Sequence, residues 1–210
     1  MGKKKQSTLQ AVVNQALCRL TLHLSTEPCL VTLHVVPVPQ KNAPLEEQVI
    51  RFQQSRIIVP GNLAKDTFPD YSEKDAYAEH RQNYCIGALA GVPIFFQHNP
   101  LVKPLLANNR VFEFMFWSSL IRSYCGFVQN LHVLGEKEAC RYASRVRNNA
   151  RTDDDPLSIG LDYAAQFVQK HGARQLRRVV EASTTAELHD MVKPREALFL
   201  QYARQNSESS

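Results

Sequence analysis

The sequence predicts an α+β fold that is mostly helical, with a short N-terminal antiparallel hairpin or ribbon. Near the N-terminus, leucine and valine alternate with polar residues over positions 20–24 and again over 31–35, which is the period of a half-buried strand. Farther along, apolar residues recur at helical spacing, and proline, glycine and aspartate mark helix ends. We therefore expect two early strands and a mainly helical C-terminal half.

Size and composition indicate one globular domain. A chain of 210 residues with 44% hydrophobic and 21% charged residues is long enough to bury a core and too apolar for wholesale disorder. We expect a basic arm at 1–7, a single domain over 8–205 and a flexible tail over 206–210. No apolar run reaches the roughly 18–20 residues that cross a bilayer, and no apolar segment follows the basic start, so we expect a cytoplasmic protein that binds no membrane.

The N-terminal elements follow from local patterns. Ser7 is expected to cap a helix from Thr8 to Cys18. Two strands then follow over 20–24 and 31–35, joined by the turn-like residues 25–28. Pro44 is expected to open a helix that runs to Gln54, and a short strand is expected over 56–59, where Pro60-Gly61-Asn62 forms a turn.

The remaining elements are predicted to be helices. The expected segments are 72–90 with Ser72 as its cap, the very apolar 110–134, 136–148, one from Pro156 to His171, 173–182 and 194–204. Gly91 and the prolines at 93, 100 and 104 predict an irregular connection between the first two of these.

Basic residues gather in three places on a chain of net charge +5 and pI near 9.0. Arginine suits phosphate because its planar fork stays charged and donates two parallel hydrogen bonds. The predicted phosphate-binding residues are Lys3, Lys4, Lys5, Arg141, Arg145, Arg174, Arg177 and Arg178. The alternative is that the helix arginines form a solvated face paired with nearby acidic residues.

The predicted hairpin offers a second candidate site. An antiparallel ribbon enters the DNA major groove and reads base edges with the side chains of one face. On this chain those side chains would be Arg19, Thr21, His23 and His34. The alternative is an ordinary sheet edge with polar residues facing water.

Metal, cofactor and catalytic signals are weak. Cys18, His23, Cys29 and His34 are spaced more widely than the close pairs of structural zinc sites, so we expect no metal and no cofactor. The five cysteines are odd in number and are expected to stay reduced. No nucleophile elbow, P-loop or dinucleotide-binding motif occurs, and Asp153–Asp155 is explained by helix capping, so we expect no enzyme.

Three segments carry a family resemblance. Leu20-Thr21-Leu22-His23-Leu24, residues 75–79 (Asp-Ala-Tyr-Ala-Glu) and residues 172–178 (Gly-Ala-Arg-Gln-Leu-Arg-Arg) occur in the order found in AcaB-like proteins of conjugative plasmids and integrative conjugative elements. The chain resembles that family over about a third of its length. The resemblance implies a dimeric regulator that binds DNA, controls transcription of transfer genes and is related to ribbon-helix-helix proteins, with the ribbon at Arg19–Ser25.

Together, these patterns predict a DNA-binding regulatory protein that is a homo-oligomer and whose partner is double-stranded DNA. Two alternatives stay open. In one, an assembly protein binds a protein partner through the apolar segment 111–134, which is rich in aromatic residues. In the other, an RNA-binding protein stacks bases on Tyr84, Phe95 and Phe96.

Overall fold

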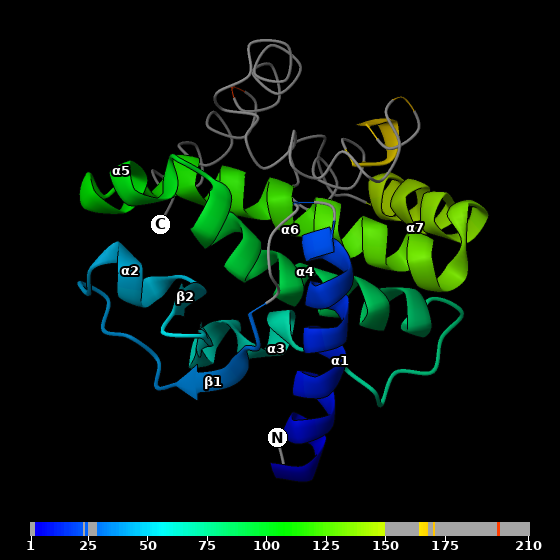
Figure 1. The fold of residues 1–210 in the computed structure, drawn as a ribbon, viewed down its shortest axis with the longest axis horizontal. Helices are drawn as coiled ribbons and strands as arrows, with labels where there is room; N and C mark the ends of the chain where they lie inside the picture. The colour runs from blue at the N-terminus through cyan, green and yellow to red at the C-terminus, as the bar shows by residue number, and fades with distance from the viewer. Residues whose placement is uncertain are drawn as a thin grey trace.

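The computed structural model describes residues 3–22, 24, 29–149, 164–167, 170 and 197 (Figure 1). Its long helices are α1 (Lys3–Leu22), α4 (Ala78–His98), α6 (Val111–Leu134) and α7 (Glu136–Asn149). Its shorter elements are β1 (Thr32–Val36), α2 (Leu45–Gln48), β2 (Arg51–Gln53), β3 (Arg56–Pro60), the 3-10 turn η1 (Gly61–Leu63), α3 (Ala64–Thr67) and α5 (Val102–Ala107). The predicted fold class, a mostly helical α+β protein with a small sheet, is confirmed.

The three strands form one mixed sheet in the order β1-β3-β2. β1 runs parallel to β3, with Leu33 opposite Ile57, and β2 pairs antiparallel with β3. The predicted strand at 56–59 is therefore confirmed. The predicted helix from Pro44 is wrong beyond Gln48, because Val49 is extended and residues 51–53 form β2. Gln54 and Ser55 adopt positive φ angles of 49° and 58° and turn the chain from β2 into β3.

The predicted ribbon strand at 20–24 is wrong, because α1 continues to Leu22. Leu20 and Leu24 are four positions apart and both buried, in line with Leu17 one turn and Val13 two turns before Leu20, whereas Leu22 is 76% exposed. The leucines therefore follow the helical period, although their alternation equally fits a strand. α1 also begins at Lys3 rather than Thr8, so Lys3, Lys4 and Lys5 lie in its first turns.

Side chains of α1 bind the outer edge of β1. Asn14 Nδ2 donates to the carbonyl of Val31 at 3.0 Å, and the Val31 N–H donates to Asn14 Oδ1 at 2.8 Å. The N–H of Leu33 lies 3.4 Å from Gln10 Oε1. Since β3 occupies the other side of β1, α1 satisfies backbone groups that an open sheet edge would expose.

Helices α4 and α6 run side by side through the centre of the molecule (Figure 1). α4 begins at Ala78 rather than near Ser72, and it runs through Pro93 to His98, so the predicted irregular connection after Gly91 is wrong up to that point. Residues 86–95 of α4 are buried. Burial of this length of helix outweighs the hydrogen bond that proline removes.

The aromatic residues of α6 fill the chain's own core. Phe114, Trp117, Tyr124 and Phe127 are all buried, and the ring of Phe114 lies edge-on to that of Phe95 at 5.4 Å. Their burial within one chain accounts for the apolar character of α6 without a partner. Within the described residues, no helix combines the length and the apolar composition needed to span a bilayer.

Candidate nucleic-acid-binding surface

Helix α7 presents a basic outer face. Its inner face, with Ala139, Tyr142 and Ala143, is buried in the hydrophobic core. Side chains at helical spacing on the opposite side form what we call the outward stripe, and all are exposed: Lys137, Arg141, Ser144, Arg145 and Asn148. The three cations follow each other at four-residue intervals, which places them about 6 Å apart along the helix axis.

Tyr77 positions two arginines of the outward stripe. The Arg145 guanidinium carbon lies 4.2 Å from the centroid of the Tyr77 ring, and that of Arg141 lies 5.8 Å from it. A cation over an aromatic face is attracted by the ring quadrupole while the edges of the guanidinium keep their hydrogen-bond donors. The contact therefore orders the arginine side chains and leaves their donors able to bind an anion.

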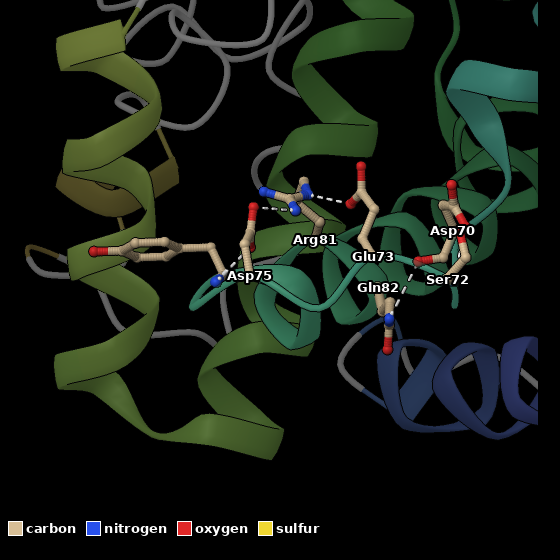
Figure 2. Close-up of polar contacts among 7 residues, drawn as sticks. Asp70, Ser72, Glu73, Asp75, Arg81 and Gln82 are labelled. Atoms are coloured by element: carbon tan, nitrogen blue, oxygen red, sulfur yellow. Dashed lines mark hydrogen bonds and ion pairs between the residues drawn. The ribbon is translucent and has the colours of Figure 1, made fainter.

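Tyr77 ends an acidic loop (residues 70–77), which Arg81 fastens to α4. Arg81 Nε donates to Glu73 Oε2 and its Nη2 donates to Asp75 Oδ2, both at 2.7 Å, so that the guanidinium lies between the two carboxylates (Figure 2). Asp75 Oδ1 also accepts the N–H of Tyr77 at 2.8 Å. We call these four residues the loop clamp, because they hold Tyr77 in place beside α7.

A second set of contacts holds the start of the acidic loop. The Asp70 side chain accepts the N–H of Ser72 at 2.8 Å and its hydroxyl at 2.6 Å, and Gln82 Nε2 lies 3.3 Å from the Asp70 carbonyl (Figure 2). Asparagine and aspartate form such turns because their short side chains reach the backbone two residues on. The predicted helix cap at Ser72 is therefore a turn.

His80 anchors α7 to α4 beneath the outward stripe. Its Nε2 lies 3.3 Å from Glu138 Oε2, and its ring stacks on Tyr142 with the centroids 5.7 Å apart. Burial raises the pKa of the Tyr142 hydroxyl well above its usual range. Glu138 also lies 3.7 Å from Arg141 Nη1, and such exposed ion pairs contribute little, so this pair leaves Arg141 able to exchange Glu138 for a phosphate.

The loop clamp is expected to weaken in acid. The hydrogen bond from Arg81, and then that from the Tyr77 N–H, hold the pKa of Asp75 below its usual value. The pKa of Asp75 is therefore lower in the folded protein than in the unfolded chain. Ionised Asp75 stabilises the fold fully at a pH above its unfolded-state pKa, and this stabilisation is lost as the pH falls through its folded-state pKa.

Arg81→Gln is expected to return the pKa of Asp75 toward its ordinary value of 3.8 and to speed proteolytic cleavage within the acidic loop. Carboxyl-carbon NMR against pH and limited proteolysis would measure the two effects. Arg56→Gln, which removes an exposed arginine from β3, is the control. An Asp75 pKa that is the same in Arg81→Gln and in the wild type would contradict the clamp.

The predicted base-reading residues do not form a common face. Arg19 lies in α1, where its Nη2 donates to Gln129 Oε1 at 2.9 Å and burial lowers its pKa. The Thr21 side chain is buried, and its hydroxyl donates to the carbonyl of Leu17 at 2.9 Å. Both residues therefore make contacts within the fold. The buried Thr21 side chain is not accessible to a base, whereas base reading by the half-buried Arg19 stays a prediction.

His34 is exposed on β1, with its Nε2 3.0 Å from Thr32 Oγ1, but β1 pairs with β3 and not with the described residues 19–22 and 24. Several predicted site residues lie outside what the structure describes: His23, Arg174, Arg177 and Arg178. The same holds for the side chains, though not the backbone, of Lys3, Lys4 and Lys5. Of the predicted phosphate-binding residues, Arg141 and Arg145 are brought together on one surface.

The aromatic residues predicted to stack RNA bases lie in the core. Phe95 is fully buried, Phe96 is half-buried against it with their centroids 5.7 Å apart, and Tyr84 Oη is 2.9 Å from Ser123 Oγ on α6. A base has no access to the Phe95 ring. The stacking prediction is therefore wrong for Phe95.

Sequence reasoning missed Lys137 in the outward stripe and Tyr77 beside it. Lys137 continues the four-residue spacing of Arg141 and Arg145 on a helix whose bounds were predicted, so the spacing alone was a sufficient signal. Tyr77 is far away in the sequence and gave no signal, because its role depends on how the acidic loop packs against α7.

The thiols of Cys85 and Cys125 are unsuited to act as nucleophiles. Burial raises the pKa of Cys85 to about 11 and that of Cys125 further still, so both stay protonated at neutral pH. Among the described residues, no three histidine, cysteine or acidic side chains gather as metal ligands would.

No protein-family model, curated protein or solved structure matches this chain.

Proposed function

We propose that this protein binds double-stranded DNA through the outward stripe of α7. The observation that carries the proposal is the row of three exposed cations, Lys137, Arg141 and Arg145, along one helix. With about 6 Å of rise per step, they offer a line of charge roughly 12 Å long, and DNA presents a regular line of phosphates to such a row.

The chemistry of the stripe suits phosphate better than a carboxylate partner. Two of its cations are arginines, whose fork binds two phosphate oxygens at once, and Tyr77 limits the side-chain entropy that Arg145 loses on binding. Ser144 and Asn148 add neutral donors on the same face. Contacts of this kind position a protein on the duplex and make binding dependent on salt.

The ribbon has no part in this proposal, since Arg19 and Thr21 are used within the fold. Control of transfer-gene transcription and a homo-oligomeric state stay predictions that rest on the family resemblance. A search for a specific operator would follow once duplex binding has been measured.

The test compares two triple variants with the same change in charge. Lys137→Gln/Arg141→Gln/Arg145→Gln removes the cations of the stripe, and Lys41→Gln/Lys65→Gln/Lys103→Gln removes three exposed cations elsewhere. Fluorescence anisotropy on a mixed-sequence duplex would be measured over a range of salt concentrations. Each lost phosphate contact reduces the slope of log K against log salt by about 0.9, so the stripe variant should lose about 2–3 units of slope.

The lysine control is expected to keep the wild-type slope with a small, uniform loss of affinity. Equal slopes for the two triple variants would refute the stripe as the binding surface. Absence of duplex binding by the wild type at low salt would refute DNA binding itself, and tighter binding to single-stranded RNA than to duplex would favour the RNA alternative.

A further inference from the structure

A small cavity of about 160 Å³ lies between α6 and the segments that precede α4. Its α6 wall includes Phe114, Ser118 and Arg122, which are four residues apart and share one face. The opposite wall comes from the chain around α2 and from η1 and α3, through residues such as Ile50 and Leu63. The cavity is separate from the outward stripe, to which it contributes no residue.

Arg122 is the unusual group in this cavity. Its Nε is sealed from solvent and has no hydrogen-bond partner among the described residues. Burial lowers the pKa of its guanidinium, although an arginine stays charged at neutral pH. A buried donor without a partner costs stability and is rare in native proteins, so its presence calls for an explanation.

The part of α4 that packs against Arg122 supplies no counter-charge. α4 packs so closely here that a Cβ on Gly91 would lie 3.2 Å from the Arg122 Cα, and the only acidic residue of α4 is Glu79 in its first turn. Cys85, whose field acts on Arg122, is neutral because burial raises its pKa to about 11. The described residues form no ion pair with Arg122.

The other described polar residues that line the cavity are two serines, a threonine and an aspartate. Ser118 and Ser119 carry hydroxyls that can donate to an anion. Thr67 Oγ1 donates to the Leu63 carbonyl at 2.7 Å and so offers only its lone pairs. Asp66, an exposed residue that also lines the cavity, is the single carboxylate among its described lining residues; it weakens the binding of any anion, and most that of an anion with more than one negative charge.

We propose that this cavity is a binding site for a small monocarboxylate, whose carboxylate is held by Arg122 with Ser118 and Ser119 and whose apolar body packs on Phe114 and Leu63. The volume is close to that of an engineered cavity of about 150 Å³ that takes up benzene, so a short-chain or benzoate-sized acid fits. A charge-assisted hydrogen bond to the half-buried Arg122 supplies the orientation that apolar contact lacks.

The test uses butyrate and benzoate as probes on the full chain, with butyramide, butylamine and inorganic phosphate for comparison. Calorimetry is expected to show saturable binding of the two carboxylates and much weaker binding of the other three. In NMR spectra the Arg122 Nε–H signal and the amides of Ser118 and Ser119 should shift during the titration. Butyramide or phosphate bound as tightly as butyrate would refute a monocarboxylate site.

Three variants locate the binding. Arg122→Met removes the charge and is expected to fold, because replacing an unpaired buried ion by an apolar side chain relieves its desolvation. It should weaken butyrate about tenfold to a hundredfold, the equivalent of one charge-assisted hydrogen bond. Ser119→Leu fills the cavity while keeping the arginine and should weaken butyrate too, whereas Arg56→Met should leave it unchanged. Wild-type affinity in both Arg122→Met and Ser119→Leu would overturn the proposal.

Discussion

Gly87→Ala is expected to lower the free energy of unfolding by about 3 kcal/mol, because it forces α4 and α6 apart. A Cβ on Gly87 would lie 2.4 Å from the carbonyl oxygen of Cys125 and 2.8 Å from the Gly126 Cα. Both are backbone atoms, so no change of rotamer relieves the overlap. Urea unfolding followed by far-UV circular dichroism measures the loss.

A fall in the free energy of unfolding would be informative, because alanine in place of glycine within a helix normally raises it by about 1 kcal/mol. Gly91→Ala is the graded comparison. A Cβ there would meet the Cβ and Sγ of Cys125 at 3.1 Å, where a side chain is able to shift, so we expect a smaller loss. A Gly87→Ala protein as stable as the wild type would show that the helices are not in close contact at this crossing.

Asn14→Ala is expected to cost about 2–4 kcal/mol, because it leaves both the N–H and the carbonyl of Val31 without their partners. Each of these backbone groups lies beside the core, where the Val31 side chain is buried. The same variant opens the outer edge of β1, which is a template for pairing with another chain. Unfolding in urea gives the stability, and light scattering at rising protein concentration gives the association.

Gln15→Ala is the matched control, since Gln15 is the next residue of α1 and is exposed. It is expected to leave stability unchanged to within about 0.5 kcal/mol. Gln10→Ala should fall between the two, because its single bond to the Leu33 N–H is long at 3.4 Å. If Asn14→Ala and Gln15→Ala were equally stable, the edge contact would have no structural importance.

Local signals correctly predicted several elements. The helix over 110–134 matches α6, and the one over 136–148 matches α7, because a long apolar period and a glycine mark their ends. Gly135 separates them with a φ of 85°, a conformation that glycine adopts without strain. The strand over 56–59 was equally clear, since a run of β-branched residues is followed by proline and glycine.

The errors have a common physical cause. Leucines at 20, 22 and 24 fit both a strand and the last turns of a helix, and only the burial of Leu20 and Leu24 against the core selects the helix. Pro93 and Gly91 are local helix breakers, yet packing against α6 keeps α4 helical through both.

The sequence by itself determined that the described part of the chain is mostly helical, where α6 and α7 lie, and that Arg141 and Arg145 share a face. These properties depend on the order of neighbouring residues, which local backbone preferences translate directly into structure. Only the tertiary structure decided that Tyr77 lies beneath Arg145, that Asn14 binds the edge of β1, and that Arg122 lines a cavity while its Nε has no hydrogen-bond partner among the described residues. Those contacts join residues far apart in the sequence, and their energies arise from burial and distance, which a single sequence does not encode locally.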